Sequence, residues 1–183
     1  MTSMTTDRVR EGGRPLRDAL YGELVWSRPG IFRRELYLEA GSERLASLRW
    51  ERMLSLEAVG ESADGRWIIG RHRIGSLRGQ VVVRDAATEA PVATFTRHWR
   101  RTGVLRFDSG AEYKWEREGF WRTSYFWSSG AQERLLAYTF RVGFHSRYEM
   151  EVSPAAQRVA ELPVLVLLGA YLMVLTSRQN AAH

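Results

Sequence analysis

The chain of 183 residues contains no cysteine, and Lys114 is the one lysine among its 27 basic residues. Without cysteine the chain has no disulfide framework, no thiolate metal site and no cysteine nucleophile. The positive charge therefore resides almost entirely on arginine. The formal net charge is +6 and the isoelectric point is about 10.1.

The N-terminal stretch has little apolar character. Residues from Met1 to Pro15 mix small, polar and charged side chains and contain no hydrophobic run of the kind a secretory signal requires. It also contains Gly12, Gly13 and Pro15, residues that are typical of turns and loops. We therefore predict a flexible arm over residues 1–18 and a cytoplasmic location, peripheral to the membrane if the protein binds lipid.

Motifs for catalysis and metal binding are also missing. No nucleophile elbow, phosphate loop or dinucleotide fingerprint occurs. Three aspartates, Asp64, Asp85 and Asp108, stand at predicted turns, where aspartate bonds its own backbone. The four histidines, His72, His98, His145 and His183, show no metal-ligand spacing. The sequence thus predicts no enzyme activity, no metal and no cofactor, with an unrecognised catalytic site as an alternative.

What the chain does contain is typical of one folded domain, which we place at residues 19–176. Hydrophobic residues make up 44%, with seven each of Trp, Tyr and Phe. Short apolar or alternating runs recur, separated by glycine-containing turns, which indicates hairpins of a barrel or sandwich. The predicted strands are 20–26, 35–38, 44–50, 56–62, 67–73, 80–85, 91–96, 102–107, 112–116, 120–127, 134–140 and 144–152.

The pattern changes near the C-terminus. Ser153 and Pro154 offer a helix start, and we predict a helix over about 155–176 followed by a tail at 177–183. The run Leu162–Leu175 has no charge, so it must be surrounded by protein or lipid. At about 1.5 Å per residue it reaches roughly 21 Å, while a bilayer core needs about 30 Å. Length favours a buried core helix; a C-terminal membrane anchor is the alternative.

A dozen antiparallel strands followed by an apolar helix, whose segment runs Glu161-Leu162-Pro163-Val164-Leu165-Val166-Leu167-Leu168-Gly169-Ala170-Tyr171-Leu172, resembles the tubby C-terminal-like superfamily. That superfamily includes LURP-one-related proteins and phospholipid scramblases. The resemblance covers about residues 20–176. It implies a mainly β fold, a closed antiparallel barrel of about twelve strands around a C-terminal hydrophobic helix. It also implies a non-enzymatic module for anionic lipid surfaces or a protein partner, and it transfers no site residues.

One local cluster suits such a ligand. Arg97, Trp99, Arg100 and Arg101 join two predicted strands and concentrate arginines around an aromatic side chain, a composition that fits phosphate or a membrane interface. A polar hairpin loop whose Trp99 folds back onto the barrel rim is the alternative, and the simpler explanation. A weaker cluster comprises Arg66, Arg71, His72, Arg73 and Arg78. The remaining charges are scattered, which argues against a continuous nucleic-acid groove.

Overall fold

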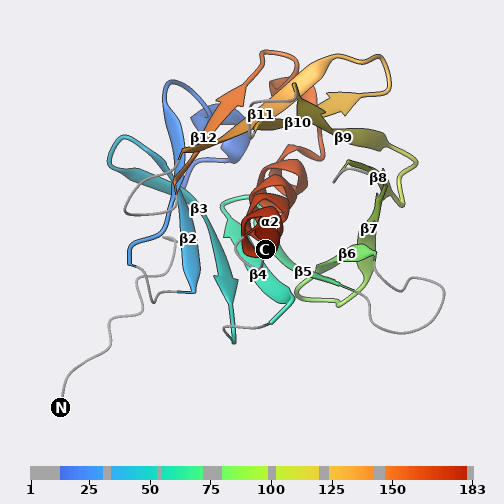
Figure 1. The fold of residues 1–183 in the computed structure, drawn as a ribbon, viewed down its shortest axis with the longest axis horizontal. Helices are drawn as coiled ribbons and strands as arrows, with labels where there is room; N and C mark the ends of the chain where they lie inside the picture. The colour runs from blue at the N-terminus through green and yellow to red at the C-terminus, as the bar shows by residue number, and fades with distance from the viewer. Residues whose placement is uncertain are drawn as a thin grey trace.

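The computed structural model is a closed antiparallel barrel of twelve strands with a helix inside it (Figure 1). It describes residues 13–30, 34–52, 55–71, 80–98, 102–119, 124–141 and 147–180. Each strand pairs with its neighbours in sequence, and β1 closes the ring by pairing with β12. The predicted fold class is confirmed.

Every predicted strand has a counterpart, with shifts of a few residues at the ends. The strands are β1 Leu24–Ser27, β2 Glu35–Ala40, β3 Glu43–Trp50, β4 Glu57–Ser62, β5 Gly65–Arg71, β6 Val81–Asp85, β7 Pro91–Arg97, β8 Gly103–Phe107, β9 Glu112–Glu118, β10 Ser124–Ser129, β11 Arg134–Arg141 and β12 Arg147–Val152. Residues 120–123 and 144–146, predicted as parts of strands, lie outside the described residues.

Alternation of side chains along the strands builds the core. In β12, Tyr148 and Met150 are buried, whereas Glu149 and Glu151 face the other way. Aromatic residues fill much of the interior. Trp115 stacks on Tyr125, with ring centroids 5.5 Å apart, and also touches Trp127 and Tyr138. The two-sided aromatic pattern of β10 therefore belongs to a strand whose inward rings are core.

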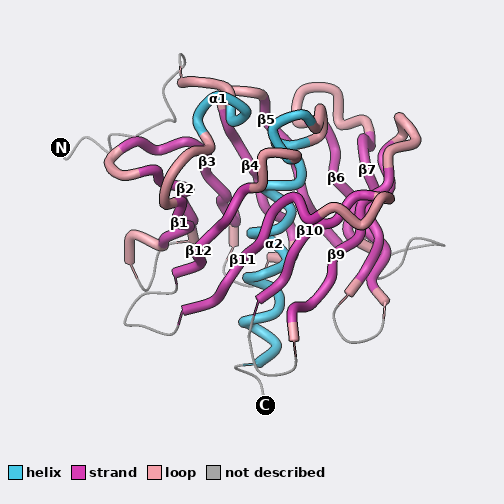
Figure 2. Tube along the Cα trace, turned by 90° about the horizontal axis from the view of Figure 1, so that it is seen from above, coloured by secondary structure: helices cyan, strands magenta, loops and turns pink. Residues whose placement is uncertain are grey.

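The apolar segment forms α2, Leu162–Asn180, which runs through the barrel (Figure 2). It packs against β3, β4, β5, β10 and β11. Leu165, Val166, Leu167 and Leu168 are completely buried. A helix apolar on all sides needs such surroundings, and the predicted core helix is confirmed.

The predicted start of this helix is wrong. Residues Ala156–Arg158 form a single 3-10 turn, η3, and Val159 is extended with φ −84° and ψ 123°. Proline lacks an N–H and its ring clashes with the carbonyl four residues earlier, so Pro163 fits only the first turn of a helix. The helix therefore begins at Leu162 and continues past Leu175 to Asn180.

The predicted N-terminal arm extends too far. Residues Leu16–Ala19 form a short helix, α1, and Leu16 is completely buried. The Leu16 amide donates to the Asp64 carboxylate at 2.9 Å, and α1 lies against α2 and η3. Burial of the apolar Leu16 side chain stabilises this segment in a folded position, although its local composition is polar. Residues 1–12 lie outside the described residues.

Antiparallel topology divides the connections between two ends of the barrel. The connections 28–34, 51–56, 72–80, 98–102, 119–123 and 142–146 join strands at the end where α2 finishes. We call this the arginine end. The connections 41–42, 63–64, 86–90, 108–111 and 130–133, and the segment 153–161, belong to the opposite end, where α2 begins. We call this the acidic end.

Candidate anion-binding end of the barrel

The two ends differ sharply in sequence. The arginine-end connections contain Arg28, Arg33, Arg34, Arg52, Arg73, Arg78, Arg100, Arg101 and Arg122, and their single acidic residue is Glu51. The acidic-end segments contain Asp64, Glu89, Asp108, Glu133 and Glu161, with Arg158 as their single arginine. The N-terminal segment 13–23 lies at the same end and adds Asp18 and Glu23 together with Arg14 and Arg17. Aromatic residues are also unevenly distributed in the sequence. The arginine-end connections contain Phe32, Trp99, Phe120, Trp121 and Phe144, whereas the acidic end has the exposed Tyr21, beside the connection 41–42.

Two half-buried arginines lie beside the last turn of α2. Arg178 donates to the Ser55 carbonyl at 3.3 Å, and its guanidinium lies 5.3 Å from the Trp50 ring centroid. Burial, with the like charge of Arg28, lowers the pKa of Arg178 below its usual value. The Nε atom of Arg28 is shielded from solvent and has no hydrogen-bond partner among the described residues. Two cations close together favour a nearby anion.

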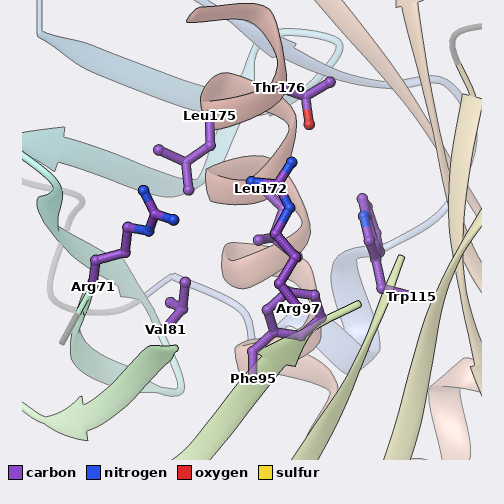
Figure 3. A pocket seen from close by; sticks show the side chains of 8 residues that line it. All are labelled: Arg71, Val81, Phe95, Arg97, Trp115, Leu172, Leu175 and Thr176. Carbon is purple, nitrogen blue, oxygen red and sulfur yellow. The ribbon is translucent and has the colours of Figure 1, made fainter. Parts of the chain in front are cut away.

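A second pair of arginines stands on the barrel wall near the end of α2. Arg71 is the last residue of β5 and Arg97 the last residue of β7, and both are half-buried. Each follows a buried inward-facing residue by two positions, Ile69 and Phe95 respectively. Both therefore share the inward face of the wall, and Figure 3 shows their side chains extending toward the final turns of α2.

Several arginines elsewhere on the barrel have carboxylate partners. The ion pairs between described residues are Arg14 with Glu43, Arg49 with Glu35, Arg84 with Glu57, Arg106 with Glu112 and Arg134 with Glu118, at 2.6–2.8 Å. None of them involves Arg28, Arg71 or Arg178. Three arginines around the end of α2, Arg28, Arg71 and Arg178, thus have no carboxylate partner among these ion pairs of the described residues.

The predicted cluster is only partly placed. Arg97 belongs to this site, whereas Trp99, Arg100 and Arg101 lie outside the described residues. The weaker cluster is divided. Arg71 is at the arginine end, but Arg66 is exposed near the start of β5, where its carbonyl accepts from the Ala86 amide at the acidic end. His72, Arg73 and Arg78 are outside the described residues.

Sequence reasoning missed Arg28, although a signal for it exists. An inward apolar residue is followed two positions later by arginine at three strand ends, in the pairs Trp26/Arg28, Ile69/Arg71 and Phe95/Arg97. Such a pattern predicts that the inward face of the wall changes from apolar to cationic at one rim.

The remaining candidates have structural roles. The Asp85 carboxylate accepts from the amides of Thr88 and Ala87, each at 2.9 Å, and these bonds lower its pKa. Asp64 accepts from Leu16 as described. His98 is exposed, and its amide donates to the Thr102 carbonyl at 2.8 Å. Within the described ranges, no group of His, Asp and Glu side chains is arranged to hold a metal.

A closed twelve-stranded barrel with a central C-terminal helix and one cationic rim is the class of protein that these observations define. No family model matches the chain, and no characterised protein or solved structure shows significant similarity to it. Among the described residues, no helix combines the length and apolar character needed to cross a membrane.

Proposed function

We propose that the protein is a non-enzymatic, peripheral binding module of the cytoplasm that docks on anionic membrane surfaces through its arginine end. The observation that carries this proposal is the axial asymmetry of charge, with an excess of arginines over carboxylates at one end and an excess of carboxylates over arginines at the other. A basic surface is attracted to anionic lipid over about a Debye length. Tryptophan and other aromatics suit the headgroup region.

The interior of the barrel supports binding rather than catalysis. α2 occupies the lumen, and the crevice beside it offers about 20 Å³, space for about one water molecule. Larger hollows of about 340 Å³ and 490 Å³ lie on the outside. In the first, the Asp64 carboxylate already accepts hydrogen bonds from Leu16 and Ser62.

The architecture also supports membership of the tubby C-terminal-like superfamily. A twelve-stranded closed barrel around an apolar C-terminal helix is the arrangement that the resemblance predicts. Because one fold serves many functions, the charge distribution carries the functional proposal and the fold does not.

Co-sedimentation with vesicles tests the proposal. We expect the full chain to bind phosphatidylcholine vesicles that contain phosphatidylserine and to ignore pure phosphatidylcholine. Raising sodium chloride from about 50 to 300 mM should release it, because salt screens surface charge. A basic residue near an anionic surface contributes about 1 kcal/mol. The double variant Arg28→Gln, Arg178→Gln should therefore bind about thirtyfold less tightly.

A matched control separates position from total charge. The double variant Arg84→Gln, Arg106→Gln also loses two positive charges, but from side chains paired with Glu57 and Glu112 on the barrel wall. It should bind nearly as well as the unmodified protein. Equal losses in both double variants would show attraction by net charge alone and refute docking through one end. Arg28→Gln alone serves if the Arg178 change reduces stability.

A further inference from the structure

We propose that the crevice between α2 and strands β5, β6, β7 and β9 binds a phosphate monoester group through Arg71, Arg97 and Thr176. The crevice belongs to the arginine end, so its use at a membrane rests on the proposed function. The proposal adds a specific ligand chemistry to a surface that is otherwise described only by its charge.

The crevice exists because α2 packs against two arcs of the barrel, β3–β5 and β10–β11, and less closely against the strands β6–β9 between them. Apolar residues line the gap between this wall and the helix, namely Val81, Phe95, Trp115, Leu172 and Leu175. Figure 3 shows the arrangement, with the two arginines at the level of the last helical turns.

Strand register shows where the two arginines lie relative to the apolar residues of the crevice. Arg71 is the partner of Val81, which pairs on its other side with Phe95. Arg97 is the partner of Gly103, which pairs with Trp115. The Phe95 ring occupies the space that a side chain at position 103 would need, since a Cβ there would lie 2.4 Å from it. Arg71 therefore lies in the same row as Phe95, and Arg97 lies one inward position nearer the rim.

Thr176 supplies the third polar group of the crevice. It is 9% exposed, and its hydroxyl has no hydrogen-bond partner among the described residues. The next residue, Ser177, bonds back to the Met173 carbonyl at 3.1 Å, so the helix itself could have satisfied Thr176. In the view of Figure 3, the Thr176 oxygen is directed to the side of α2 where Arg97 and Trp115 lie.

These three groups match a phosphate. Guanidinium groups donate paired hydrogen bonds to phosphate oxygens, and a hydroxyl can donate one more. Because the crevice holds about 20 Å³, it admits one oxygen of the ligand and leaves the rest at its mouth. A monoester presents three oxygens opposite its single substituent. A diester carries a substituent on two sides, so it approaches such a narrow opening poorly.

The source of the phosphate is a lipid headgroup or a soluble molecule, and two assays distinguish them. In the first, vesicles containing phosphatidic acid, a monoester, are compared with phosphatidylserine vesicles matched in surface potential. In the second, the thermal unfolding midpoint is measured with inorganic phosphate and with chloride at equal ionic strength, because a ligand of the folded state raises that midpoint.

Thr176→Val is the critical variant because it preserves shape and charge. We expect the unmodified protein to prefer phosphatidic acid, Thr176→Val to lose that preference while keeping its phosphatidylserine binding, and Arg71→Gln to lower phosphatidic acid binding about tenfold or more. Arg84→Gln is the charge-matched control and should keep the preference.

The outcomes separate this proposal from the docking proposal. Phosphatidylserine binding without a preference for phosphatidic acid, or a Thr176→Val protein that retains the preference, would overturn the crevice site and leave docking intact. A protein that binds no vesicle but gains stability from inorganic phosphate, with the gain lost in Thr176→Val, would refute docking and support a soluble phosphate ligand.

Discussion

At the scale of single residues, Gly169 shows how closely the helix approaches the wall. A Cβ at this position would lie 2.4 Å from Cζ of Tyr138 and 2.5 Å from its hydroxyl oxygen. Tyr138 is completely buried, and its hydroxyl donates toward the carbonyls of Leu165 and Val166 at 3.2 and 3.1 Å. The small residue and the bonded phenol therefore fix the position of α2 together.

Gly169→Ala tests this contact by the sign of its effect. Alanine in a helix interior ordinarily stabilises by about 1 kcal/mol relative to glycine. Here overpacking should reverse the effect and destabilise the protein by about 1–3 kcal/mol. Urea unfolding measures the change. Gly130→Ala, where an added Cβ meets nothing within 4 Å, is the control and should be near neutral. A stabilised Gly169→Ala protein would contradict the packing described.

Buried tyrosines predict a loss of stability at alkaline pH. Burial raises the pKa of Tyr138 well above 10, and burial also raises the pKa values of Tyr171 and Tyr148. In the unfolded chain a phenol titrates near pH 10. Since the folded values are higher, the stabilisation is complete below about pH 10 and is lost as pH rises toward the folded pKa values.

Urea midpoints at about pH 8 and pH 11 measure this loss. Each such tyrosine should cost up to about 1.4 kcal/mol per pH unit above 10. Tyr138→Phe should be less stable at pH 8, because it lacks the hydroxyl bonds, yet lose less between the two pH values. Equal losses in the variant and the unmodified protein would argue against burial of this phenol.

At the scale of elements, α2 is the part on which the barrel depends. Its side chains fill the lumen, and a fully buried leucine or valine contributes roughly 1.5–3 kcal/mol. Several such residues together exceed the 5–15 kcal/mol by which domains are usually stable. A chain that ends at Ala160 should therefore show no cooperative thermal transition by circular dichroism. A truncated chain that melts like the full one would refute the core role of the helix.

Strand positions were predictable from sequence, whereas the helix start and the first residues of the domain were not. Period-two alternation and glycine turns depend on local geometry. The bounds predicted from them for β4 and β7 therefore agree with the structure to within one residue. The mistake at the first residues of the domain came from proximity in space. Leu16 is buried only because Asp64 and the start of α2 lie beside it. The third polar group of the crevice, Thr176, is likewise a site residue only because strands distant in sequence enclose it.

At the scale of the whole molecule, positive charge is concentrated at one end of the barrel axis. The sequence shows scattered arginines, and the spacing that relates Arg28, Arg71 and Arg97 to an inward apolar residue does not extend to Arg178. Antiparallel topology groups them, because alternate connections meet at the same end. The helix C-terminus also carries partial negative charge, which favours cations around it. The result is a cationic rim that a bilayer surface can meet face on.

Orientation on a membrane tests the central claim most directly. Because the chain contains no cysteine, single cysteines can carry an environment-sensitive fluorophore at His98→Cys, at the arginine end, or at Ser42→Cys, at the acidic end; both parent side chains are exposed. With phosphatidylserine vesicles, the label at position 98 should shift its emission to the blue and the label at position 42 should not. A shift at position 42 alone, or at neither position, would contradict docking through the arginine end.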